Sequence, residues 1–332
     1  MRITYYASGW PINIGNAFID YGSVHALKTA MPTATVFYAS ELPKWLFWVN
    51  HKDPGKSLDL AELMDTDYLV VSGMSLCDEF IAVEGPVLQR MSERGVKIVF
   101  NGGGGQTYEP AEVEHFRAFF QTINCVGFLS RDARSYENFQ DCCPLSYSGI
   151  DCGFFLSDAF TPAPLVIRDY VVYAFDQKQE PPIAPPPQRI IRAHHASSEV
   201  LPNLHSRWLR AGRTALALQR TWPFVRLILD GVASAILDRQ DTLISDLADD
   251  YLHLYANASA VYSDRVHACV AALSFGKSAR LYADTPRGSL FDRVGAAALT
   301  DRLVSLDQDE LRTEKENQVA FLRKIFEQKD PQ

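Results

Sequence analysis

An arginine and a histidine, Arg265 and His267, stand two residues apart where a short strand pattern gives way to a helix pattern. The apolar residues that follow recur at i, i+3, i+4 and i+7, which predicts one buried face of a helix that stops at Gly276. Ser263 is a suitable N-cap, so both side chains are expected in or next to the first turn. Unpaired N–H groups and the positive end of the helix dipole favour an anion there.

The two residue types predict an anion site with a proton donor beside it. A guanidinium group binds phosphate or carboxylate through paired N–H groups, and an imidazole moves a proton near neutral pH. Residues two apart on a regular helix point about 200° apart, so both reach one ligand only if the helix begins here. In the structural alternative, Arg265 pairs with Asp264 or a carboxylate of the tail and His267 packs in the interior.

Arg131 has a similar setting earlier in the chain. A strand pattern ends just before it, Ser130 and Asp132 supply polar caps, and a helix pattern follows. Arg131 is therefore a second candidate for binding an anion, with a salt bridge to Asp132 or to a neighbouring loop as the structural alternative. Arg287 lies in a polar segment after the last strand pattern, where it could help to hold a diphosphate.

Strand and helix patterns alternate through the first half of the chain. Strands are predicted over 2–6, 35–38, 68–71, 97–100 and 126–129, and helices over about 17–28, 86–94 and 111–122. Such alternation predicts a doubly wound parallel sheet, whose ligands bind at the carboxyl ends of the strands. Those ends carry Ser72 and Gly73, residues 101–106 and residues 130–132.

Two glycine-containing loops also lie at predicted strand ends. The glycines at 102–105, which include Gly103 and Gly104, indicate either a close approach of the backbone to a ligand or a flexible loop. The loop over 8–16 contains Asn13, Gly15 and Asn16, and its N–H groups could face a substrate. A simple turn is favoured for this second loop, because it lacks both G-x-G-x-x-G and G-K-[S/T].

The second half of the chain begins a new β-rich pattern over 165–175. A proline-rich loop over 180–187, a helix-rich region over 207–250, a helix over about 243–255 and a final helix over about 307–327 follow. The adjacent His194 and His195 cannot chelate like an i, i+4 pair, and a solvent-exposed pair is expected. The prediction is an α/β protein with two doubly wound domains, 1–158 and 159–332, whose last helix could pack back on the first domain.

Composition limits the classes of partner. The chain has 332 residues, 47% of them hydrophobic and 22% charged, which suits two globular domains. Its net charge of −8 argues against nucleic acid or an anionic membrane as the main partner. No apolar run is long enough for a membrane span, and no signal-peptide pattern is present. Six cysteines without CxxC spacing predict reduced thiols, no zinc site and a cytoplasmic protein.

Three stretches together resemble the polysaccharide pyruvyl transferase family. The first is Arg265-Val-His267, followed by Ala272-Leu-Ser-Phe-Gly-Lys277, which resembles the family's Arg-x-His and Ala-x-x-Phe-Gly-Lys pattern. The second is Ser130-Arg131-Asp132-Ala-Arg-Ser135, and the third is Asn13-Ile-Gly-Asn16. Asn16 stands where the family usually has Asp, and Ser72-Gly73 stands where it has Gly-Gly.

The resemblance implies two Rossmann-like domains facing a cleft, as in GT-B glycosyltransferases, with an acceptor side in the first domain and a donor site in the second. It implies phosphoenolpyruvate as donor, a sugar of an exopolysaccharide or other cell-surface glycan, or of its precursor, as acceptor, and a pyruvate ketal as product. No cofactor or metal is required. The expected catalytic residues are His267 and Arg265. The expected substrate-binding residues are Arg131, Asn13, Gly15, Asn16, Ser263, Gly73, Gly103, Gly104 and Arg287.

Two other functions stay open on the same frame. A nucleotide-sugar glycosyltransferase would use Arg265, with help from Arg287, to bind a diphosphate. A non-catalytic glycan-binding relative would retain the frame without turnover, and Asn16 and the altered glycine motif favour it weakly.

Overall fold

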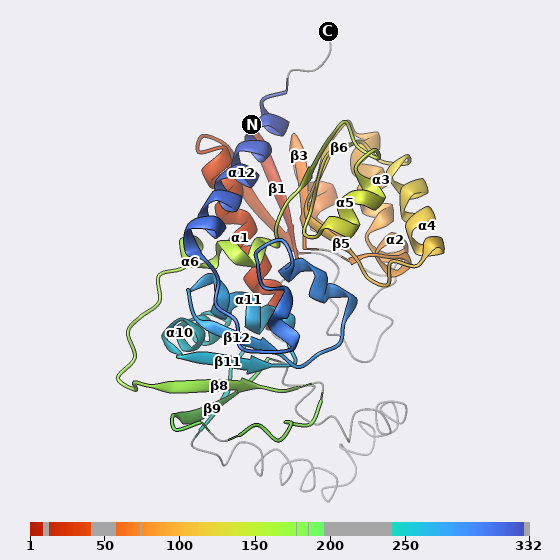
Figure 1. Ribbon diagram of the computed structural model, residues 1–332. Coiled ribbons are helices and arrows are strands. Elements are labelled where there is room, and N and C mark those ends of the chain that lie inside the picture. Colours follow the sequence, from red (N-terminus) through yellow and green to blue (C-terminus); the bar gives the residue numbers. More distant parts are fainter. Residues whose placement is uncertain are drawn as a thin grey trace, which may run out of the picture.

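The computed structural model describes residues 1–8, 13–40, 58–73, 75–176, 178–184, 186–195 and 241–328, and the structural statements below concern these residues. Most of the helix-rich region predicted over 207–250 lies outside them. The described chain forms two parallel β-sheets, one above the other in Figure 1, with helices around and between them. The two predicted doubly wound parallel sheets are therefore confirmed. The domain boundary between residues 158 and 159 stays a prediction.

The first sheet has the strand order β2-β1-β3-β5-β6-β7, and β4 pairs with β5. Its strands are β1 (Arg2–Ala7), β2 (Thr35–Ser40), β3 (Tyr68–Ser72), β4 (Ser75–Leu76), β5 (Lys97–Gly105), β6 (Cys125–Ser130) and β7 (Leu145–Ser148). Successive side chains of β3 enter opposite cores, as strand geometry requires: Val70 faces one cluster, and Leu69 and Val71 face the other. Both faces of the sheet are therefore covered, which is typical of parallel sheets.

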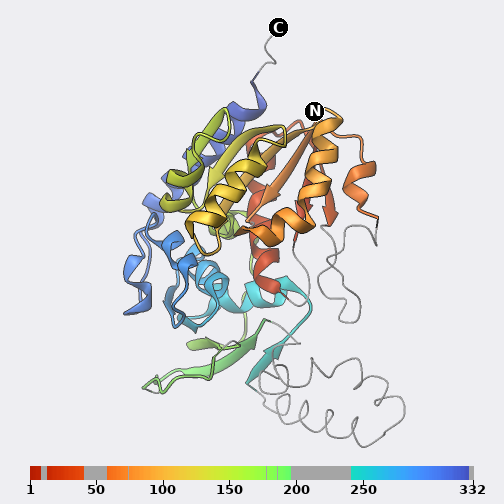
Figure 2. The same cartoon turned by 90° about the vertical axis from the view of Figure 1, so that its right-hand side faces the viewer.

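Helices lie on both sides of this sheet (Figures 1 and 2). Helix α1 (Ile14–Ala30) lies on one face, and α2 (Asp78–Val83), α3 (Gly85–Glu93), α4 (Pro110–Phe120) and α5 (Ala133–Phe139) lie on the other. The second face is packed largely with aromatic rings, because Phe100 and Phe128 of the sheet contact Phe116 and Phe120 of α4. A short helical turn, η1 (Leu60–Leu63), precedes β3.

The second sheet has the order β10-β9-β8-β11-β12. Its strands are β8 (Tyr170–Ala174), β9 (Arg189–His194), β10 (Thr242–Ile244), β11 (Ala260–Ser263) and β12 (Ser278–Leu281), with α10 (Ala248–Asn257) and α11 (Val266–Ser274) between strands. Two short pieces, η2 (Cys152–Phe155) and α6 (Leu156–Ala159), lead from the first sheet to the second. After β12 come η3 (Pro286–Phe291), η4 (Ala297–Thr300) and the long α12 (Gln308–Phe326).

One continuous hydrophobic cluster joins the two sheets. Phe18 of α1, Phe154 of η2 and Val270 of α11 all belong to it, together with residues of both sheets. The contact between α1 and η2 is so close that a Cβ at Gly22 would overlap the carbonyl oxygen of Cys152. The region between the sheets is therefore a packed core at this point.

Helix α12 returns to the first sheet and lies beside α1 (Figure 1). The Phe326 ring meets the Tyr68 ring edge-on, with 5.0 Å between centroids. Arg323 Nε donates to the carbonyl oxygen of Ala30 over 3.2 Å, and Lys315 pairs with Asp158 over 2.8 Å. Helix α12 thus links the C-terminal end of the described chain to α1 near its beginning and to α6 near its middle.

Several predicted elements differ in detail from the structure. Helix α1 begins at Ile14, three residues before the predicted start, because residues of the supposed loop already form its first turn. The glycines at 102–105 continue strand β5. The helix predicted over 243–255 is divided into β10 and α10. Strand β7, whose polar residues gave no strand pattern, was not predicted.

Candidate functional site

A polar cavity of about 260 Å³ lies where the first turns of α1 and α11 come together. It opens at the carboxyl ends of β1, β3 and β6, the edge of the sheet predicted to bind a ligand. Six of the predicted site residues line it. The lining residues are Ser8, Asn13, Asn16, Gly73, Ser75, Cys77, Glu79, Phe80, Glu84, Gln106, Arg131, His267 and Arg287.

Two helix starts meet at this cavity. Asn13 is the N-cap of α1, and Asn16, in the first turn, donates from Nδ2 to the carbonyl oxygen of Ser8 over 3.3 Å. His267 is the second residue of α11. Its ring lies directly against Gly15, where an added Cβ would stand 3.0 Å from the His267 Cβ. Gly15 therefore lets the two positive helix ends approach each other, an arrangement that favours an anion.

Arg131 is buried beside the cavity, with 2% of its surface exposed. Its Nη1 donates to the carbonyl oxygen of Gly73 over 3.2 Å, while Nε and Nη2 have no hydrogen-bond partner in the described chain. The side chain crosses so close to Gly104 that a Cβ there would overlap the guanidinium group. The close approach predicted for the glycine run thus exists, but its partner is Arg131. Gly103 instead faces Phe128 in the core.

Arg287 supplies a second, half-buried guanidinium group from η3. Its Nη2 donates to Ser75 Oγ over 3.3 Å. Burial lowers the pKa of Arg287, and the nearby Arg131 cation lowers it further. Among the described residues, neither of these two guanidinium groups is paired with a carboxylate. Two carboxylates, Glu79 and Glu84, also line the cavity, but neither forms an ion pair with Arg131 or Arg287 among the described residues.

Asp151 lies behind His267 and was not predicted as a site residue. Its side chain is fully buried, and Oδ2 stands 3.6 Å from His267 Nε2, an ion-pair distance. Its Oδ1 accepts from the N–H of Gly153 over 2.8 Å. Burial alone would raise the pKa of Asp151, but His267, Arg131 and the Gly153 N–H hold it below its ordinary value. The Asp151 carboxylate is thus kept charged beside the His267 ring.

Arg265 does not line this cavity, so the predicted convergence of Arg265 and His267 on one ligand is not found there. Arg265 is the N-cap of α11 with extended backbone angles, so it stands just before the helix rather than within its first turn. Its Nε pairs with Asp176 Oδ2 over 3.2 Å, and it is not among the residues that line the 260 Å³ cavity. The buried Asp176 also contacts His194 Nδ1 at 2.8 Å and accepts from the N–H of His195 over 2.9 Å.

Ser263, His194 and His195 do not line the cavity, and their polar atoms bind other parts of the fold. Ser263 is not the N-cap: its Oγ donates to the carbonyl oxygen of Ala174 and accepts from the N–H of Arg265, each over 2.8 Å. His195 is 2% exposed, so the predicted exposed pair is wrong. Its Nε2 contacts the hydroxyl of Tyr255, and burial lowers the pKa of His195 to about 3. His195 and Tyr255 are 60 positions apart in the sequence, so local patterns could not predict this contact.

The family model for polysaccharide pyruvyl transferase matches residues 13–283. The chain belongs to the polysaccharide pyruvyl transferase family. It is therefore a transferase of a family that pyruvylates polysaccharides. The match begins at the first helix start of the cavity and includes Arg131, Asp151 and His267, whereas Arg287 and α12 lie after its end. Among curated proteins, none matches the chain.

Solved structures of other proteins share the fold of this transferase. A co-structure of MnaA with UDP from S. aureus is 13% identical, with a TM-score of 0.51 over 97% of this chain and 90% of that one. The UDP-GlcNAc 2-epimerase from Methanocaldococcus jannaschii, in complex with UDP-GlcNAc and UDP, is 11% identical, with a TM-score of 0.50 over 98% of each chain. At such identities the likeness concerns the fold alone, which is a GT-B-like pair of parallel-sheet units.

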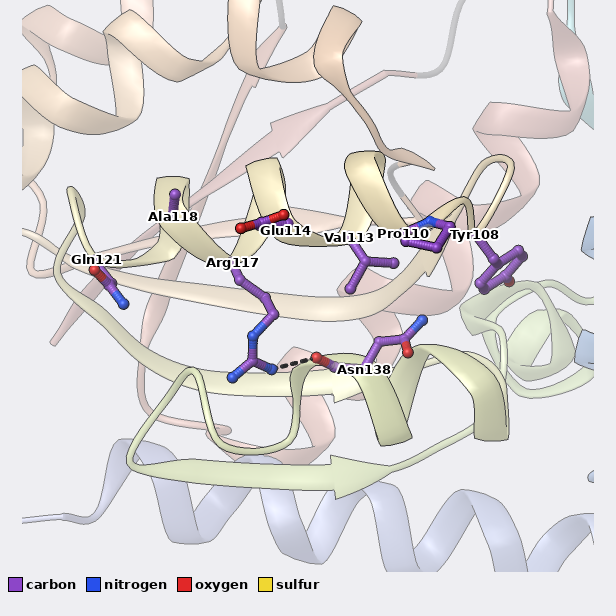
Figure 3. A pocket seen from close by; sticks show the side chains of 8 residues that line it. All are labelled: Tyr108, Pro110, Val113, Glu114, Arg117, Ala118, Gln121 and Asn138. Atoms are coloured by element: carbon purple, nitrogen blue, oxygen red, sulfur yellow. Dashed lines mark hydrogen bonds between the residues drawn. The ribbon is translucent and has the colours of Figure 1, made fainter.

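A second hollow of about 540 Å³ lies on the outside of the transferase, between α4 and α5 (Figure 3). Arg117 reaches across it, and its Nη1 donates to the carbonyl oxygen of Asn138 (Figure 3) and to Asp141. None of the predicted site residues lines this hollow. In the described parts of the chain, no helix is long and apolar enough to cross a bilayer, and no cluster of three metal-ligating side chains occurs.

Proposed function

We propose that this transferase moves pyruvate from phosphoenolpyruvate to two hydroxyls of a sugar in a polysaccharide or its precursor, forming a pyruvate ketal. One observation carries the proposal: the buried guanidinium group of Arg131, the half-buried guanidinium group of Arg287 and two helix starts surround one cavity, and neither guanidinium group is paired with a carboxylate among the described residues. Phosphoenolpyruvate carries a phosphate and a carboxylate, so it would supply the missing negative charge at both guanidinium groups.

The donor would lie between residues of the two halves. Arg131 comes from the end of β6, and Arg287 follows the second sheet, so each would bind one anionic group of the donor. The first-turn N–H groups of α1 and α11 would add further donors. Gly73 leaves its carbonyl oxygen to orient Arg131, which fixes the guanidinium plane.

His267 would act as the general acid at the methylene carbon of the donor. Protonation at that carbon makes the central carbon electrophilic, and a sugar hydroxyl adds to it while releasing its proton. The second hydroxyl then displaces phosphate, so two C–O bonds form, the C–O bond to phosphate breaks, and one proton each is gained by the methyl carbon and by the departing phosphate. Asp151 would stabilise the imidazolium form of His267 through its buried charge.

Arg265 has a different proposed role from the one expected from the sequence. Its ion pair with Asp176 ties the start of α11 to the loop after β8, so it would hold His267 in place from the far side. Arg265 is therefore proposed as a positioning residue, and Arg131 and Arg287 as the donor-binding arginines.

The test is turnover of phosphoenolpyruvate with a panel of sugar acceptors. Phosphate release and a product with the mass of a pyruvate ketal are expected, and both should be lost in His267→Gln. Phosphoenolpyruvate, but not UDP, should raise the melting temperature. Stabilisation by UDP alone would instead support a nucleotide-sugar transferase, and glycan binding without turnover of any donor would support a non-catalytic relative. The cytoplasmic location is a separate prediction, which cell fractionation tests.

A further inference from the structure

Gln318 is a fully buried polar residue on α12, outside the segment that matches the family model. Both ends of its side-chain amide are used. Its Oε1 accepts from the backbone N–H of Ile150 over 2.7 Å, and its Nε2 donates to Asn101 Oδ1 over 3.3 Å. Burying an amide costs little free energy of folding only when both its oxygen and its nitrogen form hydrogen bonds. Gln318 thus joins the C-terminal helix to the interior of the first sheet.

The Gln318 amide holds the backbone immediately before Asp151. Ile150 is the preceding residue, and on its other side Gly149 donates its N–H to the carbonyl oxygen of Ser130 over 3.1 Å. A Cβ at Gly149 would stand 2.5 Å from Gln318 Oε1, so the glycine makes room for the amide. On the far side of Asp151, the Gly153 N–H binds its carboxylate. The carboxylate is therefore fixed from both directions along the chain.

The Nε2 end of the Gln318 amide binds Asn101, which is linked to Arg131 through Gly73. The carbonyl oxygen of Asn101 accepts from Ser72 Oγ over 2.8 Å and from the N–H of Gly73 over 3.2 Å. Gly73 in turn presents its carbonyl oxygen to Arg131. The route from Gln318 to Arg131 runs through three hydrogen bonds, by way of Asn101 and Gly73. The route to Asp151 needs only one, to the neighbouring Ile150. The effect of Gln318 is therefore expected mainly at Asp151 and His267.

We propose that Gln318 is a positioning residue for pyruvyl transfer, which sets the distance between Asp151 and His267 from the C-terminal helix. The inference rests on the proposed function of His267 as the general acid. Without the amide, the Ile150 N–H would lose its buried acceptor, and the Asp151 backbone would shift to find another. Small displacements of catalytic groups lower turnover strongly, while donor binding at Arg131 and Arg287 is retained.

The experiment replaces Gln318 by Met, which keeps length and burial and removes both hydrogen bonds. The kcat of Gln318→Met should fall about 10-fold with KM for phosphoenolpyruvate unchanged. Asn317→Met, the same exchange on the exposed neighbour, should leave both constants unchanged. Gln318→Glu retains an acceptor for Ile150 and should keep more of kcat than Met does, and it replaces the Met variant if that one does not fold.

A double-mutant cycle separates positioning from general support of the fold. In an Asp151→Asn background, Gln318→Met should cause no further loss of kcat, because the two changes act through one carboxylate. Independent losses that multiply in the double mutant would overturn the proposal, as would an unchanged kcat in Gln318→Met.

A readout without turnover keeps this inference separate from the proposed function. Absence of phosphate release by the unaltered chain would refute the pyruvyl-transfer proposal itself. The imidazole ¹⁵N resonances of His267 would still report its contact with Asp151. They should move in Gln318→Met and in Asp151→Asn but not in Asn317→Met, and unchanged resonances in Gln318→Met would refute the positioning role.

Discussion

Arg131 is buried and Arg265 is largely buried, and the two arginines have nearly the same place relative to strand and helix but different ion-pair partners. Each follows the end of a parallel strand, β6 or β11, and each stands close to the start of the next helix. Arg265 pairs with the buried carboxylate of Asp176. Arg131 receives only the carbonyl oxygen of Gly73, and two of its nitrogens have no partner among the described residues.

The difference separates a structural arginine from a candidate ligand-binding arginine. A buried cation is costly unless it is paired, so a fold that needs one for stability also supplies its counter-ion. The chain supplies that counter-ion on the second sheet, at Asp176. Beside the first sheet, Arg131 has no carboxylate within ion-pair distance among the described residues and borders a cavity, where we expect the substrate to bring the pairing anion.

The largest expected effect concerns the paired side of this comparison. Asp176→Ala removes the buried carboxylate that pairs with the largely buried Arg265, and we expect the free energy of unfolding to fall by about 3–5 kcal/mol. Urea denaturation measures this change. A loss below about 1 kcal/mol would show that the pair contributes little and would remove the contrast with Arg131.

Arg131→Met should show the reverse pattern. Loss of the guanidinium group should raise KM for phosphoenolpyruvate about 100-fold, equivalent to about 2.8 kcal/mol. The free energy of unfolding should stay the same or rise, because an unpaired buried charge is removed. Steady-state kinetics and urea denaturation of the same preparation check both halves, and strong destabilisation with normal KM would contradict the assignment.

The cluster around Asp176 should also make stability depend on pH. Burial lowers the pKa of His195 to about 3, so the unfolded chain takes up a proton at this residue before the folded chain does. Stability from this group is complete above the ordinary histidine pKa, near 6.5, and is lost as the pH falls toward 3. The slope should approach about 1.4 kcal/mol per pH unit below pH 6. Unfolding of His195→Asn measured from pH 7 to 4 should lose this slope.

The smallest effect is stabilisation by inorganic phosphate. At fivefold its dissociation constant, phosphate should add about 1 kcal/mol to the free energy of unfolding. Arg131→Met should abolish this gain in a thermal-shift titration, whereas Arg117→Met, on the outer face between α4 and α5, should retain it. Equal stabilisation of all three proteins would place the anion elsewhere.

Local patterns were sufficient to predict much of the fold and part of the site. The βα alternation predicted both parallel sheets, and the strand-end rule led to Arg131 and Gly73, which do line the cavity. The same rule also selected Arg265, which does not. The direction of that side chain depends on the extended backbone at one N-cap residue, and residue types alone do not determine it.

Contacts over long sequence separations could not be predicted from patterns. Asp151 meets His267 across 116 positions (267 − 151), and only folding brings the two together. His195 is buried by contacts with α1 and α10, and its neighbours in the sequence, which mix apolar and polar residues, did not indicate this burial. Gln318 lies on the buried face of α12. Because most residues of this helix are charged or polar, the sequence alone would place a glutamine on its exposed face.

The close packing at Gly22 bears on how far the two sheets can move during catalysis. The backbone of α1 rests there on the chain that links the two sheets, with no room for even a methyl group. On its other side the same link touches α11 of the second half, where a Cβ at Gly153 would stand 2.9 Å from Val270. Opening and closing the halves like a hinge would have to separate this second contact. We therefore expect the two sheets to keep a constant angle to each other, so that the substrates bind in a preformed cavity.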